Sequence, residues 1–178
     1  MNAFDRPIKY IATEKADFII PFFQRKYVWE KANWERIWDT LISDEKENFL
    51  GSIVVKELPP KNDTDRKQLS IIDGQQRFTT LSILAKALLD GMDMLRDKDK
   101  GELNKLLFNF DSKRINGEYV DNQSKKIHHS RYDEEEYTKI IEGVYIDNYE
   151  TIRDNSSLLA QCYKYFRERI KNANKNED

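Results

Sequence analysis

Residues Ile71-Ile72-Asp73-Gly74-Gln75-Gln76-Arg77-Phe78-Thr79-Thr80-Leu81 form the stretch around which the rest of the chain is organised. A short apolar run ends at an Asp-Gly pair, which is typical of a turn, and a helical pattern follows at once. The apolar residues of that pattern recur every three or four positions, at Leu81, Leu84, Ala85, Leu88, Leu89 and Met92. The stretch therefore predicts a strand, a turn and a helix over about residues 75–95.

This junction carries unusual chemistry for a turn. A helix start points free backbone N–H groups and the positive end of the helix dipole at one place, which favours an anion, above all a phosphate. An acid, two amides and a guanidinium occupy the same turn, at Asp73, Gln75, Gln76 and Arg77. The alternative is that Asp73 is a plain helix N-cap beside an ordinary turn glycine. Residue types alone leave both interpretations open.

Length and composition exclude several classes of protein. The chain has 178 residues, enough for one domain or one and a half, and its charged fraction is 35% against 39% hydrophobic. A net charge of −2 argues against an overall basic clamp for nucleic acid, so any DNA contact would need a local patch. The single cysteine, Cys162, excludes a disulfide framework within one chain. No apolar run approaches the ~18 residues of a membrane span, so we expect a cytoplasmic protein without membrane contact.

Before the junction, the pattern predicts an extended segment over residues 17–21 and a loop that lines a site over residues 22–30. A helix follows over residues 31–42, where the apolar stripe has a helical period. Residues 49–57 are rich in β-branched side chains and predict a strand, which pairs as a hairpin with residues 68–72. Gly51-Ser52 interrupts that first strand where a ligand or another backbone could approach.

After the junction, a charged connection at residues 96–101 is the candidate boundary between a core domain, residues 1–97, and an extension, residues 98–178. In the extension we expect a strand over residues 103–110, a turn region over residues 111–122, and pairing by residues 123–129. A variant capping box at residues 130–133 predicts a helix that stops at Gly143. The last helix is expected over residues 156–172.

A second Gln-Arg pair, Gln24-Arg25, lies in the predicted loop. If the two pairs converge, they form a polyphosphate pocket in which Asp73 holds Mg²⁺ or acts on a water, and Gln75 or Gln76 positions that water. The alternative for Arg25 and Arg77 is a structural salt bridge. Two aromatic residues of the loop, Tyr27 and Trp29, either stack on a base or belong to the core.

Other candidate sites are weaker. Adjacent residues of a strand point to opposite faces, so His128 and His129 could not readily share one metal ion, and no third ligand lies at a helpful spacing. The acidic run at residues 133–136 fits a solvated helix start. No P-loop and no dinucleotide-binding fingerprint is present.

Three blocks of the sequence together resemble a known family. They are Ile20-Pro21-Phe22-Phe23-Gln24-Arg25-Lys26-Tyr27-Val28-Trp29, then Phe49-Leu50-Gly51-Ser52-Ile53, then Ile72-Asp73-Gly74-Gln75-Gln76-Arg77 with Thr79-Thr80-Leu81. In order and spacing they resemble the N-terminal domain of GmrSD-type restriction endonucleases, and the resemblance covers nearly the whole chain. It implies an α+β fold, with a small mixed ParB/sulfiredoxin-like sheet, packed helices and a helix-rich extension.

The resemblance also implies a function. Members bind and hydrolyse a nucleoside triphosphate (GTP, ATP or another) with Mg²⁺, in systems that restrict phage DNA, often DNA with modified bases. The nucleotide-site positions carried over are Gln24, Arg25, Asp73, Gly74, Gln75, Gln76 and Arg77, with Tyr27, Trp29, Gly51 and Ser52 as neighbours. Nuclease activity usually lies in a separate C-terminal HNH domain, and this sequence has no HNH motif.

We therefore expect a nucleotidase domain that gates a nuclease domain or effector subunit. We also expect a downstream domain to contact DNA, and the assembly to include homo-oligomers as one of its forms. The alternative is a non-catalytic ParB-like module that binds DNA or protein.

Overall fold

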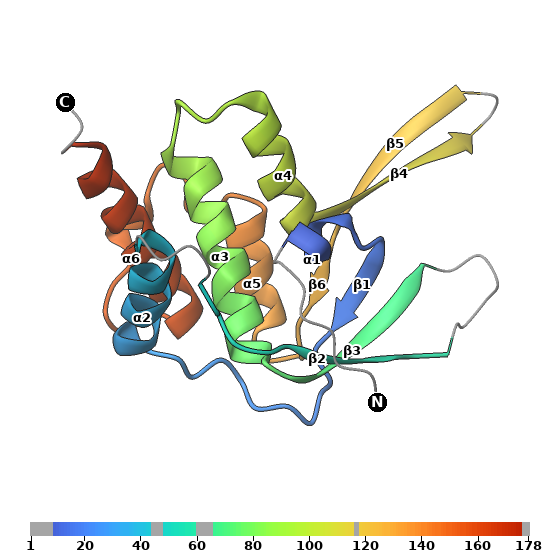
Figure 1. The fold of residues 1–178 in the computed structure, drawn as a ribbon, viewed down its shortest axis with the longest axis horizontal. Coiled ribbons are helices and arrows are strands. Elements are labelled where there is room, and N and C mark those ends of the chain that lie inside the picture. Colours follow the sequence, from blue (N-terminus) through green and yellow to red (C-terminus); the bar gives the residue numbers. More distant parts are fainter. Residues whose placement is uncertain (1–8, 44–47, 60–65, 116–117, 176–178) are drawn as a thin grey trace.

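The computed structural model describes residues 9–43, 48–59, 66–115 and 118–175, and it shows helices packed against a small mixed sheet (Figure 1). This confirms the α+β class. The elements in chain order are α1 (Lys9–Thr13), β1 (Ala16–Ile19), α2 (Lys31–Ile42), β2 (Val54–Glu57), β3 (Lys67–Asp73), α3 (Gln75–Gly91), α4 (Asp97–Leu107), β4 (Phe108–Ile115), β5 (Glu118–Lys125), β6 (Ile127–His128), α5 (Glu134–Ile141), the 3-10 turn η1 (Tyr149–Thr151) and α6 (Leu158–Asn174).

The sheet has the order β2-β3-β1-β6. The hairpin of β2 and β3 is antiparallel, whereas β1 runs parallel to β3 on one side and to β6 on the other. The hairpin was predicted, but its first strand begins at Val54 rather than at residue 49. Gly51 has a φ of 91°, which is incompatible with an extended strand, so residues 49–53 form a connection instead.

Helix α3 lies at the centre of the fold. The ring of Phe78 packs on that of Phe18 from β1, with 5.0 Å between centroids, so α3 is attached to the sheet. At its other end, Asp90 accepts a hydrogen bond from the Tyr163 hydroxyl of α6 (2.6 Å) and pairs with Lys86. The helix ends at Gly91, earlier than predicted, where a Cβ would lie 3.2 Å from atoms of α6.

The charged segment after α3 is a helix, which corrects two predictions. Residues 97–107 form α4, although residues 96–101 were expected to be a connection and residues 103–110 a strand. Leu103, Leu106 and Leu107 have the spacing of one helix face and pack on the core. Two acids in the first turn complement the helix dipole. The strand begins only at Phe108.

A two-stranded ribbon, β4 and β5, projects from the body (Figure 1). The predicted turn region at residues 111–122 is therefore wrong for most of its length, because both strands continue through it. The expected pairing of residues 123–129 holds only for residues 123–125. The chain then turns into the sheet at Lys126, whose buried ammonium group donates to carbonyl groups of Ile11, Ala12 and Glu14 at the end of α1.

The predicted capping box at residues 130–133 is wrong. Ser130 Oγ finds no partner among the described residues, and the Asp133 carboxylate binds the backbone N–H of Tyr27 instead (2.7 Å). Helix α5 nevertheless starts at Glu134 and ends before Gly143, whose φ is 85°, as the sequence predicted. Helix α6 starts with a true cap, in which the Ser157 hydroxyl accepts from Ala160 N–H.

One continuous hydrophobic core joins residues from both sides of the proposed boundary at residue 97. The division into two parts stays a prediction. Most of the predicted loop after β2, residues 60–65, lies outside the described residues. Within the described ranges, no helix is both long enough and apolar enough to cross a membrane.

Candidate functional site

The two Gln-Arg pairs meet in space. A pocket of about 210 Å³ lies between the loop after β1 and the start of α3, and Figure 1 shows that loop running below this end of the helix. The residues that line the pocket are Gln24, Arg25, Trp29, Asp73, Gly74, Gln75, Gln76 and Arg77.

Amide side chains from α3 fix the loop. Gln76 Oε1 accepts from the backbone N–H groups of Val28 (2.8 Å) and Trp29 (3.3 Å), and its Nε2 donates to the carbonyl of Lys26 (3.2 Å). Gln75 Nε2 donates to the carbonyl of Arg25. These contacts occupy both lone pairs of Gln76 Oε1 and one of the two N–H groups of its Nε2. Gln76 therefore positions the loop, and its side-chain oxygen has no lone pair left to accept from a water.

Gln24 ties the other end of the loop to the sheet, because its Nε2 donates to the carbonyl of Ile72 at the end of β3 (3.1 Å). The loop is thus attached both to the end of β3 and to the start of α3, on either side of the turn at Asp73-Gly74. Its main chain is a fixed wall of the pocket.

The start of α3 is open. Its N-cap is Gly74, with a φ of 85°, and no side chain among the described residues caps the helix, so the alternative in which Asp73 is the N-cap is wrong. Only glycine fits, because a Cβ here would lie 2.6 Å from the carbonyl oxygen of Ser52. The first N–H groups of an uncapped helix have no intrahelical acceptor and can bind an anion.

Arg77 is held by the connection before β2. Its Nη1 donates to the carbonyl of Ser52 (2.6 Å), and its guanidinium lies against Gly51, where a Cβ would come within 2.4 Å of Cζ. Gly51 and Ser52 do not line the pocket. They support the arginine that does.

The charged groups of the pocket have no ion-pair partners among the described residues. Arg25 and Asp73 are exposed and make no side-chain hydrogen bond there, and Arg77 binds only a carbonyl. The expected alternative, a structural salt bridge for each arginine, is not what the described part of the chain shows. Two guanidinium groups that lack an acidic partner among the described residues, beside an open helix start, make the pocket attractive to anions.

The two aromatic residues of the loop have different positions. Trp29 lines the pocket, whereas Tyr27 is only 4% exposed and lies in the core. The hydroxyl of Tyr27 shares a hydrogen bond with Thr80 (2.6 Å), accepts from Trp34 Nε1 (2.9 Å) and contacts Cys162 Sγ. Tyr27 therefore joins the loop to three helices and has no surface left for a ligand.

The sequence assigned Asp133 to a capping box and an acidic helix start, and it did not predict the contact of Asp133 with this region. Its carboxylate receives the N–H of Tyr27 across 106 positions of sequence, and burial raises the pKa of this carboxyl group. No local pattern signals such a contact, because the partner is a backbone group of a distant loop.

The described residues contain no group of three or more His, Cys, Asp or Glu side chains that could hold a metal ion. His129 is poorly placed to bind a metal ion. Its Nδ1 is enclosed and has no hydrogen-bond partner in the described part of the chain, its ring packs on Tyr137 at 4.3 Å between centroids, and burial lowers its pKa to about 3. Asp73 is a single exposed carboxylate. It fits a Mg²⁺ that takes its other ligands from phosphates and water, which is the usual arrangement.

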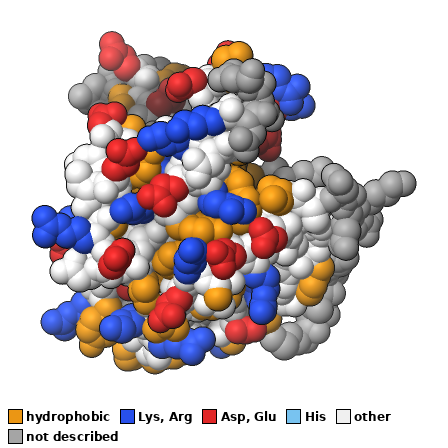
Figure 2. All heavy atoms as spheres, turned by 90° about the vertical axis from the view of Figure 1, so that its left-hand side faces the viewer, with side chains coloured by type: hydrophobic (Ala, Val, Ile, Leu, Met, Phe, Trp, Pro, Cys, Tyr) orange, Lys and Arg blue, Asp and Glu red, His pale blue; other side chains and the backbone are white. Residues whose placement is uncertain are grey.

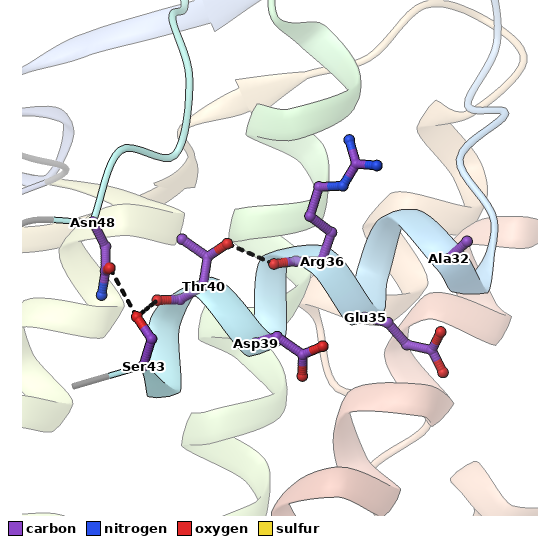
Figure 3. A pocket seen from close by; sticks show the side chains of 7 residues that line it. All are labelled: Ala32, Glu35, Arg36, Asp39, Thr40, Ser43 and Asn48. Carbon is purple, nitrogen blue, oxygen red and sulfur yellow. Dashed lines mark hydrogen bonds between the residues drawn. The ribbon is translucent and has the colours of Figure 1, made fainter. Parts of the chain in front are cut away.

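A larger hollow of about 540 Å³ lies along α2, but its polar groups do not converge (Figure 3). Thr40 donates to the carbonyl of Arg36 and Ser43 to Asn48, while Glu35 and Arg36 point apart. Figure 2 shows the side of the molecule that carries α2 and α6, where charges of both signs are scattered. The hollow is a surface depression, and the predicted site residues line the smaller pocket instead.

Comparison with known protein families gives a match over residues 8–177 to the family described as GmrSD restriction endonuclease, N-terminal domain. Comparison with curated proteins gives no match. The family match covers all three sequence blocks and every residue of the pocket. The chain therefore belongs to the family of GmrSD restriction endonuclease N-terminal domains and is a component of a restriction system, a form of phage defence.

Proposed function

We propose that this domain binds a nucleoside triphosphate, with the phosphates in the pocket at the start of α3, and hydrolyses it with Mg²⁺. The observation that carries the proposal is the meeting of Arg25 and Arg77, both without an acidic partner among the described residues, at an uncapped helix start. Phosphate groups match this combination of planar guanidinium donors and free N–H groups.

The two arginines have different mechanical roles in the proposal. Arg77 is pre-positioned by Ser52 and Gly51, so it meets a phosphate without losing much side-chain freedom. Arg25 is exposed on the loop and closes over the ligand, while its main chain stays fixed by Gln75. One rigid and one mobile cation therefore hold the phosphate chain.

Asp73 would hold the Mg²⁺ together with phosphate oxygens. When bound, the ion neutralises charge on the phosphate that is transferred. Gln75 keeps its side-chain oxygen without a donor among the described residues, so this oxygen is available to orient the attacking water. Gln76 contributes only indirectly, because it fixes the loop that carries Arg25.

The proposal extends to gating of a separate nuclease domain or effector. The fixed loop reaches the core through Tyr27, whose hydroxyl contacts α3 and α6. A force that a bound nucleotide exerts on this loop would therefore reach α6 through Tyr27.

Phosphate release tests the proposal. The assay compares wild type with Arg25→Gln and Asp73→Asn, with and without Mg²⁺. Both side chains are exposed, so neither change should unfold the domain. Matched controls are Arg96→Gln and Asp93→Asn, exposed residues beyond the opposite end of α3.

We expect each pocket variant to lose about tenfold or more in turnover, because a hydrogen bond to a charged group contributes about 1.5–3 kcal/mol. The controls should keep wild-type rates. Folded pocket variants with unchanged release would refute the proposal. A DNA mobility shift without nucleotide, together with no phosphate release by wild type, would favour the non-catalytic binding module instead.

A further inference from the structure

We propose that the aromatic turn Phe22-Phe23 binds the base of the nucleotide whose phosphates occupy the pocket, by stacking and without selecting among bases. The inference rests on the proposed function and names a second subsite of it. The occupant is one chemical class, the nucleobase of a nucleoside triphosphate.

The two phenylalanines are unusually exposed. Phe22 is 85% exposed and Phe23 is 69% exposed, and the two rings lie edge to face at 5.7 Å between centroids. Two adjacent bare rings are an apolar feature that a solvated turn does not require. They are next in sequence to Gln24 and Arg25, which line the pocket.

The turn that carries the rings is rigid. The N–H of Gln24 donates to the carbonyl of Pro21 (3.0 Å), which closes a tight turn with both phenylalanines at its tip. The Gln24 side chain ties the end of that turn to β3, and proline fixes φ at its start. The rings are therefore presented by a fixed main chain, which reduces the entropy lost when a ligand binds.

The pocket is too small for a whole nucleotide. Pockets that enclose a drug-sized ligand hold roughly 300–1,000 Å³, whereas this one holds about 210 Å³. If the phosphates fill it, the sugar and base must lie outside, on the rim. The bare rings precede Gln24 and Arg25 directly in the sequence, so the turn that carries them is continuous with one wall of the pocket.

The chemistry of the turn predicts how a base is bound. Phenylalanine has no hydrogen-bonding group in its side chain, so it cannot read the edge of a base. Every base has a π-face, so stacking on a ring tolerates all of them. The triphosphate would then be recognised by charge and the base only by its flat surface.

Binding measurements with four probes and inorganic tripolyphosphate test the inference. The probes are ATP, GTP, CTP and UTP, and the proteins are wild type, Phe22→Ala/Phe23→Ala, and Tyr119→Ala. Tyr119 is a matched control, because it is an aromatic residue that is also exposed but lies on the ribbon. Removal of exposed rings should leave the fold intact in both variants.

We expect the double variant to bind all four nucleotides roughly tenfold more weakly, within the range found for one base–aromatic stack. Its affinity for tripolyphosphate should be unchanged, and Tyr119→Ala should match wild type throughout. Unchanged nucleotide affinity, an equal loss for tripolyphosphate, or a loss confined to one base would overturn the inference while the phosphate site stands. Failure of wild type to bind any nucleotide or tripolyphosphate would overturn the proposed function and this inference with it.

Discussion

Replacement of Gln76 by alanine should release the loop that forms one wall of the pocket. The change removes two hydrogen bonds of ordinary length, to Val28 N–H and from Nε2 to Lys26 carbonyl, and one longer bond to Trp29 N–H. At about 1 kcal/mol net for each ordinary bond and less for the long one, the loss is about 2–3 kcal/mol. Alanine regains a few tenths through its helix propensity. The expected decrease in the free energy of unfolding is therefore about 2 kcal/mol.

Urea unfolding measures this decrease, and two variants calibrate it. Gln24→Ala removes a single partly exposed hydrogen bond and should cost about 0.5–1 kcal/mol. Gln123→Ala, an exposed residue of the ribbon, should change nothing measurable. A second assay is limited trypsin digestion after Arg25 and Lys26, which should become faster in Gln76→Ala because the main chain there is no longer fixed.

The order of the three variants in free energy of unfolding tests whether Gln76 holds the loop. If Gln76→Ala costs no more than Gln24→Ala and trypsin cuts no faster, the loop is held by other contacts and the role assigned to Gln76 is wrong.

Three further predictions concern the elements around the pocket. Gly74→Ala should lower the free energy of unfolding by more than about 2 kcal/mol in thermal denaturation, because φ is 85° and the new Cβ meets the Ser52 carbonyl. Its control is Gly101→Ala, which lies in a helix with open space around it and should raise the free energy of unfolding by up to about 1 kcal/mol. Tyr27→Phe should cost about 1–3 kcal/mol in urea unfolding, since it leaves the buried partners of the hydroxyl unpaired, and a loss below about 0.5 kcal/mol would contradict that network. Burial lowers the pKa of His129 to about 3, so the unfolded chain binds one more proton than the folded chain between that value and pH 6.5. The stability associated with this neutral histidine is therefore complete above pH 6.5 and falls as the pH drops below it. His129→Gln should flatten the acid limb of a stability–pH curve, and an unchanged slope between pH 6 and pH 4 would exclude the effect.

Local patterns in the sequence were sufficient for the central unit of the fold. The strand, glycine turn and helix at residues 71–91 follow from a change in hydrophobic period at Asp73-Gly74, and the structure has them there. Helix α2 and the end of α5 before Gly143 were also predicted correctly, because each depends only on residues that are neighbours in the sequence. The error at α4 had a physical cause: its charged first turn has the composition of a loop, and only packing against the core makes it a helix.

The organisation of the pocket could be predicted only in part. The sequence predicted a pocket only on the condition that Gln24-Arg25 and Gln76-Arg77 converge, and the structure brings them to one pocket. The role of Gln76 could not be read in advance, because its partners are main-chain groups 47 to 50 positions away, and every residue has such groups. Tyr27 is similar, since whether an aromatic ring faces a ligand or the core depends on tertiary packing.

The amide of Gln76 has a consequence for how this family can diversify. It binds only main-chain atoms of the loop, so it holds whatever side chains the loop displays. Lys26 and Val28 are both exposed, and exchanging them would alter the outer surface without altering the frame. Such an arrangement separates the scaffold from the variable display, as antigen-binding loops do on a constant framework. An engineer could therefore randomise these two positions to seek new ligands while keeping the proposed phosphate site intact.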